Sequence, residues 1–133
     1  MQDPAIPKKT LAVDFDGVIS YYKGFKGKGV FGPPIEGCRE MLNDLIKNDW
    51  TVIINTTRSE TPDIKAYLNL HNIPYHHINF NPENVRQQLS DTKVVAHVYL
   101  DDRAVRFNGN WKEAAEQIMN FEPWWRKEPT DGE

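Results

Sequence analysis

Short apolar runs alternate with amphipathic segments through the middle of this chain. The runs at 11–13, 52–54, 78–80 and 94–100 are rich in branched residues and have the length of strands. The runs that begin at 52 and 94 are continuous, which is typical of strands covered on both faces. The pattern therefore predicts four short strands, two of them buried on both sides.

Segments with the spacing of apolar residues expected for helices lie between and after these runs. They cover 38–46, 61–71, 81–89 and 111–119. The second and third open on Thr61-Pro62 and Asn81-Pro82, in which a capping residue precedes a proline. Strands and helices in this order build right-handed crossovers. We therefore predict an α/β fold, a three-layer αβα sandwich of Rossmann type with a central parallel sheet and helices on both of its faces.

Length and composition are consistent with one such domain. The 133 residues suffice for a single core, which we place at 10–121, with tails at 1–9 and 122–133 that we expect to fray. The net charge of -3 gives no electrostatic reason to expect nucleic acid or a membrane as an obligatory partner. Cys38 has no second cysteine to pair with, and no apolar run is long enough for a bilayer span or a signal peptide. We therefore expect a cytoplasmic protein.

Polar residues follow three of the predicted strands. They are Asp14 and Asp16, Thr56 and Thr57, and Asp101 and Asp102, with Lys93 just before the last strand. The carboxyl ends of parallel strands share one edge of the sheet, where ligands bind. Carboxylates gathered there repel one another unless a divalent cation lies among them, and oxygen ligands suit Mg²⁺. A hydroxyl and an ammonium group beside that ion would suit a phosphoryl group.

These residues occur in the order of the four motifs of the haloacid dehalogenase-like (HAD) hydrolases, which the chain resembles from about 10 to 119. The motifs are Asp14-Phe15-Asp16-Gly17-Val18, Thr56 after 52–55, Lys93, and Asp101-Asp102 after 98–100. The runs 99–104 and 108–111 also resemble a small subgroup among phage and bacterial proteins. The resemblance implies a Mg²⁺-dependent phosphatase without a cap domain, because the segments where caps are inserted are short here.

The resemblance also implies roles for individual residues. Asp14 would be the nucleophile that forms an aspartyl-phosphate, and Asp16 the general acid and base. Thr56 would hydrogen-bond the phosphoryl group and Lys93 would neutralise it, although relatives often carry Lys-Pro where Val94 follows here. The expected Mg²⁺ ligands are Asp14, the backbone carbonyl of Asp16, Asp101 and Asp102, the last through water or by orienting the others. Gly17, Thr57 and Arg58 would contact the substrate.

Several residues have a second interpretation. Thr57 suits a capping role, and Arg58 and Arg103 suit either a substrate anion or ion pairs with Glu60 and Asp102. The four histidines fit packing or hydrogen bonding better than a zinc site, since the adjacent pair at 76 and 77 would point to opposite faces of an extended segment. We expect the tryptophans at 124 and 125 to fold back over the core.

The lysine- and glycine-rich loop at 21–29 leaves the choice of substrate open. Its alternating aromatic and lysine residues could stack on bases and contact phosphates, which extends the hypothesis to nucleotides or nucleic-acid ends. A mobile, solvated loop explains the same residues. A different class of function is a phospho-ligand binding or phosphoacceptor module on the same fold. A receiver domain is disfavoured, because no aspartate follows the third strand.

Overall fold

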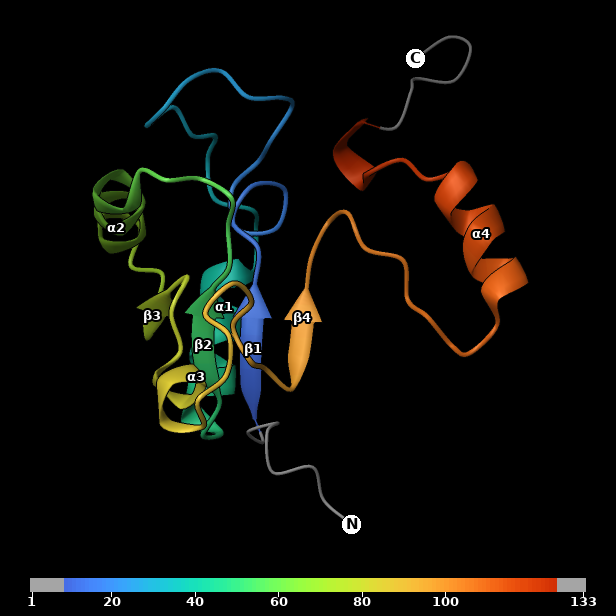
Figure 1. Cartoon of the computed structure of the whole chain (residues 1–133). Coiled ribbons are helices and arrows are strands. Elements are labelled where there is room, and N and C mark those ends of the chain that lie inside the picture. The colour runs from blue at the N-terminus through green and yellow to red at the C-terminus, as the bar shows by residue number, and fades with distance from the viewer. Residues whose placement is uncertain (1–8, 127–133) are drawn as a thin grey trace, which may run out of the picture.

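The computed structural model describes residues 9–126, in which a four-stranded parallel sheet is flanked by helices (Figure 1). The strands are β1 (Thr10–Val13), β2 (Thr51–Ile54), β3 (His77–Ile78) and β4 (Val98–Leu100), in the order β3-β2-β1-β4. The helices are α1 (Cys38–Lys47), α2 (Thr61–Leu70), α3 (Pro82–Arg86), α4 (Trp111–Met119) and the short 3-10 helix η1 (Trp124–Arg126). The predicted α/β class and parallel sheet are confirmed.

One face of the sheet carries the main hydrophobic core. Alternate residues of β1 and β2 point to this face and are buried there with side chains from α1 and α2: Leu11, Val13, Val52, Ile54, Leu42, Ile64 and Leu68. Phe15, which follows β1, is fully buried and packs edge-on against Phe31 and Tyr67. The residue between the two aspartates therefore anchors the end of β1 in the core.

The opposite face is covered by an extended segment. Ala12 and Ile53 point to this face and are buried under Val94 and Ala96. Two buried asparagines hold the backbone between them: the Asn81 amide donates to the Val95 carbonyl at 2.8 Å, and the Val95 N–H donates to Asn84 Oδ1 at 2.9 Å. The predicted strand over 94–100 is therefore wrong in its first half. An apolar run signals burial, and here side chains replace the strand hydrogen bonds.

The last helix does not complete a third layer. Figure 1 shows α4 on the far side of β4, apart from the sheet. The β4 side chains are 40–50% exposed, and Trp111 and Met119 of α4 are about three-quarters exposed. The prediction that β4 is buried on both faces is therefore wrong, and the three-layer sandwich is not confirmed. Helices α1 and α2 cover one face, whereas the other is covered by an extended segment to which Asn84 of α3 is hydrogen-bonded (Figure 1).

The structure describes only part of the two predicted tails. Residues 1–8 and 127–133, most of the two predicted tails, lie outside the described residues. Within the predicted C-terminal tail, however, η1 forms a turn whose Trp124 indole donates to the Gly17 carbonyl at 2.7 Å. Trp124 thus contacts the loop after β1 and Trp125 contacts Asp102 after β4, so the expectation that they fold back over the hydrophobic core is wrong. Within residues 9–126, no helix has the length and apolar character needed to cross a membrane.

Candidate functional site

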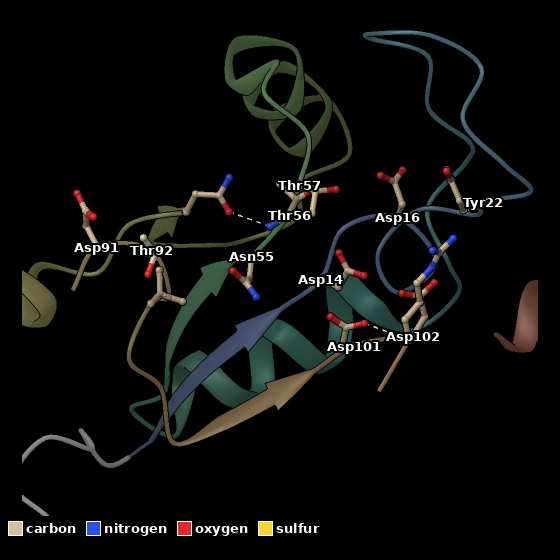
Figure 2. Close-up of a pocket in the computed structure, with 13 residues that line it drawn as sticks. Asp14, Asp16, Tyr22, Asn55, Thr56, Thr57, Asp91, Thr92, Asp101 and Asp102 are labelled. Carbon is tan, nitrogen blue, oxygen red and sulfur yellow. Dashed lines mark hydrogen bonds between the residues drawn. The ribbon is translucent and has the colours of Figure 1, made fainter. Parts of the chain in front are cut away.

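Three carboxylates meet where β1 and β4 end (Figure 2). Asp14 follows β1, Asp101 and Asp102 follow β4, and one oxygen from each lies within 4.8 Å of the others. The two strand ends are joined by a hydrogen bond of 2.9 Å from the Asp14 N–H to the Leu100 carbonyl. The parallel pairing of β1 with β4 therefore brings residues almost ninety positions apart into one cluster.

The electrostatics of this cluster favour a cation. Burial, a hydrogen bond to Asp102 and the charge of Asp101 together raise the pKa of Asp14 to about 8, although the Phe15 N–H, which donates to Asp14 Oδ1 at 2.8 Å, opposes the rise. The cluster thus has more negative charge than its surroundings offset. Three carboxylate oxygens are a donor set that suits a hard divalent ion such as Mg²⁺, with water completing the coordination. The residues present therefore fit a metal site.

A cavity of about 610 Å³ opens next to the cluster. Its lining is mostly polar: Asp14, Asp16, Tyr22, Asn55, Thr56, Thr57, Asn79, Asp91, Thr92, Val94, Asp101, Asp102 and Arg103. Thr56 is fixed at the end of β2 by two hydrogen bonds. Its backbone N–H donates to Asn79 Oδ1 at 2.8 Å, and its hydroxyl oxygen accepts the backbone N–H of Arg58 at 3.1 Å. Within residues 9–126 the Thr56 hydroxyl donates to no acceptor, so its proton is available to a ligand in the cavity.

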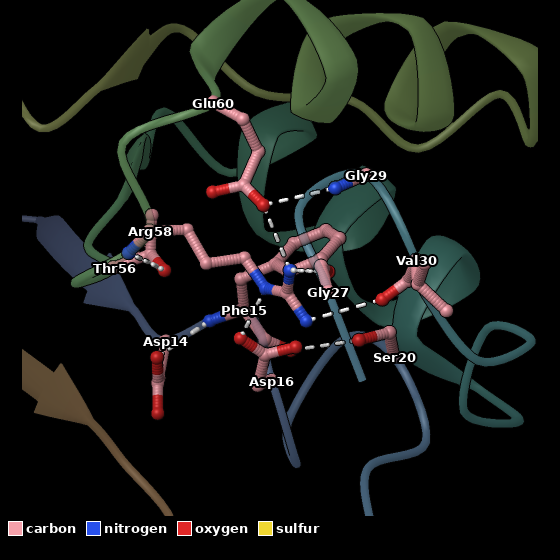
Figure 3. Close-up of polar contacts among 10 residues, drawn as sticks. All are labelled: Asp14, Phe15, Asp16, Ser20, Gly27, Gly29, Val30, Thr56, Arg58 and Glu60. Atoms are coloured by element: carbon pink, nitrogen blue, oxygen red, sulfur yellow. Dashed lines mark hydrogen bonds and ion pairs between the residues drawn. The ribbon is translucent and has the colours of Figure 1, made fainter. Parts of the chain in front are cut away.

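Asp16 is turned away from Asp14 and toward Arg58 (Figure 3). Arg58 Nε donates to Asp16 Oδ2 at 2.7 Å, and the side chains are 4% and 19% exposed. Asp16 Oδ1 is buried and has no hydrogen-bond partner among the described residues. A buried oxygen without a donor is costly, so Oδ1 is the unsatisfied atom of this ion pair.

The Arg58 guanidinium is hydrogen-bonded to other groups of the protein. Its Nη1 donates to Glu60 at 2.9 Å and to the Gly27 carbonyl at 3.3 Å, and its Nη2 donates to the Val30 carbonyl at 3.2 Å. Hydrogen bonding and the charges of its two carboxylate partners outweigh burial and raise the pKa of Arg58. Of the two interpretations of Arg58, the ion pair with Glu60 is the one that the structure contains. Arg58 does not line the cavity beside Asp14.

The lysine-rich loop is fastened by this arginine. The Arg58 guanidinium lies 5.1 Å from the ring centre of Phe25 and 4.7 Å from that of Phe31, and the Gly29 N–H donates to Glu60 at 3.0 Å. Beneath the loop lies a second cavity of about 510 Å³, which shares Asp16 and Tyr22 with the first. Its lining includes Lys23 and Lys26. Arg58 and Glu60 therefore hold the loop beside Asp16, while its three lysines and Phe25 stay exposed.

Three other residues singled out in the sequence take distinct positions. Lys93 Nζ lies 4.8 Å from the ring centre of Tyr99, and Lys93 is not among the residues that line the cavity of Asp14. Gly17 also lies outside this cavity and instead abuts Asp102. Arg103 lines the cavity, its backbone N–H donates to Asp101 Oδ1 at 2.7 Å, and its guanidinium lies over Trp125. Among the residues that line this cavity, Arg103 is the one with a cationic side chain.

Besides Tyr22, an aromatic residue of the loop at 21–29, the cavity contains residues that the sequence did not mark: Asn55, Asn79, Asp91 and Thr92. Asn55 and Asn79 follow β2 and β3, so the rule that polar residues at strand ends form the site could have found both. Asp91 and Thr92 belong to an irregular segment, and no local pattern marks them.

The histidines take structural roles, as expected. His76 Nδ1 accepts the Val52 N–H at 2.9 Å, and His97 stacks on Trp50 with their planes 6° apart. His71 contacts the ring of Tyr67. Among the described residues, the group of side chains arranged to hold a metal ion is the aspartate cluster, without a histidine.

Comparisons with known proteins support the fold class, an α/β protein with a parallel sheet. No protein-family model matches the chain, and no curated protein matches it. A solved structure of a conserved protein from Bacteroides thetaiotaomicron is similar over 83% of this chain and 88% of its own, with 24% identity and a TM-score of 0.59. A structural-genomics target from Vibrio cholerae shares 23% identity over 84% of this chain and 97% of its own, with a TM-score of 0.48. The first likeness supports the fold alone.

Proposed function

We propose that this protein is a HAD-like, Mg²⁺-dependent phosphomonoester hydrolase that works through an aspartyl-phosphate on Asp14. The observation that carries the proposal is the meeting of Asp14, Asp101 and Asp102 at the edge of a polar cavity that Thr56 also lines. A Mg²⁺ ion held by the three carboxylates would supply positive charge next to the phosphoryl oxygens. Thr56 would donate its hydroxyl proton to one of those oxygens, and Arg103 would add a charge from the cavity wall.

In the proposed mechanism, two acids carry the covalent steps. Asp14 attacks phosphorus, the bond between phosphorus and the ester oxygen breaks, and the leaving oxygen takes a proton from Asp16. Water then attacks the aspartyl-phosphate, Asp16 accepts the proton of that water, and the bond between phosphorus and Asp14 breaks to release inorganic phosphate. Because Arg58 holds Oδ2 and Oδ1 is buried, this role requires the Asp16 side chain to turn toward Asp14 when substrate binds.

The test measures phosphate released from a panel of phosphomonoesters with Mg²⁺, comparing the wild type with Asp14→Asn. Asp44→Asn is a matched control, since it makes the same change on the exposed surface of α1. The proposal expects turnover by the wild type and the control, none by Asp14→Asn, and none in EDTA. Activity that survives Asp14→Asn would remove the nucleophile from the proposal.

A phospho-ligand binding or phosphoacceptor module is the second candidate, and the Arg58 ion pair favours it. A general acid must carry a proton, whereas Asp16 here accepts a hydrogen bond from a permanent cation at 2.7 Å. Lys93, the residue expected to neutralise the phosphoryl group, lies against Tyr99. Calorimetric titration with inorganic phosphate and Mg²⁺ separates the two candidates. Tight binding without turnover of any ester would favour the binding module.

A further inference from the structure

The C-terminal turn η1 reaches the candidate metal site through one side chain. The indole Nε1–H of Trp125 donates to Asp102 Oδ2, one of the three clustered carboxylates. The neighbouring indole of Trp124 donates to a backbone carbonyl, that of Gly17, at 2.7 Å. Two adjacent tryptophans therefore bind the same region with similar bonds, but only the bond from Trp125 ends on a carboxylate of the cluster.

The surroundings of Trp125 fix its ring in place. Tyr22, which lines the cavity, packs edge-on against it with ring centres 4.9 Å apart and planes at 89°. The guanidinium groups of Arg103 and Arg126 lie 5.5 Å and 5.2 Å from the centre of the ring. An indole held by an aromatic contact and two cations presents its N–H in one direction.

Gly17 leaves the space that this hydrogen bond needs. A Cβ atom built at Gly17 would lie 2.3 Å from Asp102 Oδ2 and 2.9 Å from Trp125 Nε1, both too close for any side chain. Its φ of +83° also favours glycine. The glycine after Asp16 is thus required where Asp102 and Trp125 meet.

We propose that Trp125 is a positioning residue that holds Asp102 in the orientation needed to bind a divalent cation together with Asp14 and Asp101. When a fixed N–H donates to one oxygen of a carboxylate, the carboxylate is held in one orientation, and its other oxygen points in a fixed direction. The side chain then loses less rotational freedom when it binds the ion. The inference rests on the proposed function, because it requires a cation at the three carboxylates. It adds that a segment 23 residues after Asp102 sets the affinity of the site.

The experiment measures Mn²⁺ affinity by electron paramagnetic resonance for the full chain and three variants. Trp125→Phe removes the donor and keeps an aromatic ring, Trp124→Phe makes the same change at the bond to Gly17, and Trp125→His keeps a ring N–H. We expect Trp125→Phe to weaken Mn²⁺ binding by about 10-fold to 100-fold, the usual effect of losing a hydrogen bond to a metal ligand. Trp124→Phe should change it less than about twofold, and Trp125→His should restore part of the loss.

Two further measurements separate positioning from folding. Urea unfolding without metal shows whether the two phenylalanine variants lose similar stability while differing in Mn²⁺ affinity. In the ¹⁵N spectrum of the wild type, the Nε1–H signal of Trp125 should shift on addition of Mg²⁺ more than that of Trp124. Equal affinity loss in both variants, wild-type affinity in Trp125→Phe, or an unmoved Trp125 signal would overturn the inference and leave the proposed function standing. A wild type that binds no Mn²⁺ would overturn both.

Discussion

Replacing Arg58 by methionine tests the buried ion pair that fastens the loop over Asp16. Methionine keeps an unbranched apolar side chain in place of the arginine stem and removes the charge and all side-chain donors. Asp16 would then lose its partner at 2.7 Å, and the carbonyls of Gly27 and Val30 would lose theirs. Because the Arg58 side chain is only 4% exposed, water cannot replace these donors without opening the loop.

The expected cost follows from the burial of the two charges. Breaking a buried pair by removing one partner typically costs about 3–5 kcal/mol. The Asp16 side chain keeps 19% exposure, which places this pair toward the lower end, at about 3 kcal/mol in the free energy of unfolding. Such a loss is a large share of the roughly 5–15 kcal/mol that stabilises a domain of ordinary size.

Urea denaturation at pH 7, followed by far-UV circular dichroism, measures this loss. Arg86→Met is the matched control, since the Arg86 side chain is 68% exposed and its pair with Glu83 lies on the surface, so its effect should be hard to resolve. Adding Asp16→Asn to Arg58→Met should recover part of the stability, because it removes one of the two carboxylate charges, Asp16 and Glu60, that the first substitution leaves unpaired. A loss below about 1 kcal/mol for Arg58→Met would refute the reasoning, since the pair would then behave as a solvated one.

Three further predictions concern the site itself. The folded protein raises the pKa of Asp14 from 3.8 to about 8, so without metal the proton on Asp14 stabilises the fold at low pH, and this stabilisation is lost as the pH rises toward 8. In EDTA, Asp14→Asn should therefore flatten the dependence of melting temperature on pH. Mg²⁺ should raise the melting temperature of the wild type more at pH 8 than at pH 6, because the proton competes with the ion at the lower pH. An unchanged pH dependence in Asp14→Asn would contradict this account. Gly17→Ala should weaken Mn²⁺ binding and lower stability by about 1–3 kcal/mol in urea denaturation, since it combines a strained φ with a clash against Asp102; wild-type values for both would show that the turn adjusts freely. Replacing Lys23, Lys26 and Lys28 together by alanine should slow phosphate release from oligonucleotide ends more than from a small ester, because two of them line the cavity beside Asp16, and equal slowing would exclude nucleic acid from the hypothesis.

The order of elements and the meeting of the acids were readable from the sequence. Strand-length apolar runs and helical spacing are local signals, and they located all four strands and four helices near their observed positions. Parallel pairing then requires the residues that follow β1 and β4 to share an edge, so the proximity of Asp14 to Asp101 and Asp102 follows from the motif order.

The apolar pattern showed which segments are buried, but it did not show which element covers each face of the sheet. The run from Val94 onward is buried at its start, yet it crosses the face of the sheet, because Asn81 and Asn84 satisfy the backbone of Val95. The apolar face of α4 was equally clear in the sequence, but α4 lies apart from the sheet. Periodicity shows which side of an element is apolar, while the identity of its neighbour depends on the whole chain.

The partners of the charged and hydrogen-bonding side chains were decided by tertiary structure alone. Arg58 meets Asp16 across 42 positions, Trp124 meets Gly17 across 107, and Lys93 turns to Tyr99 rather than to the acids. A lysine or arginine side chain can reach several carboxylates and aromatic rings. Desolvation and geometry select one of these partners only after the core has formed. The sequence by itself thus determined that carboxylates gather at one edge of a parallel sheet. The fold decided which of them remain free for a cation and which one is held by an arginine.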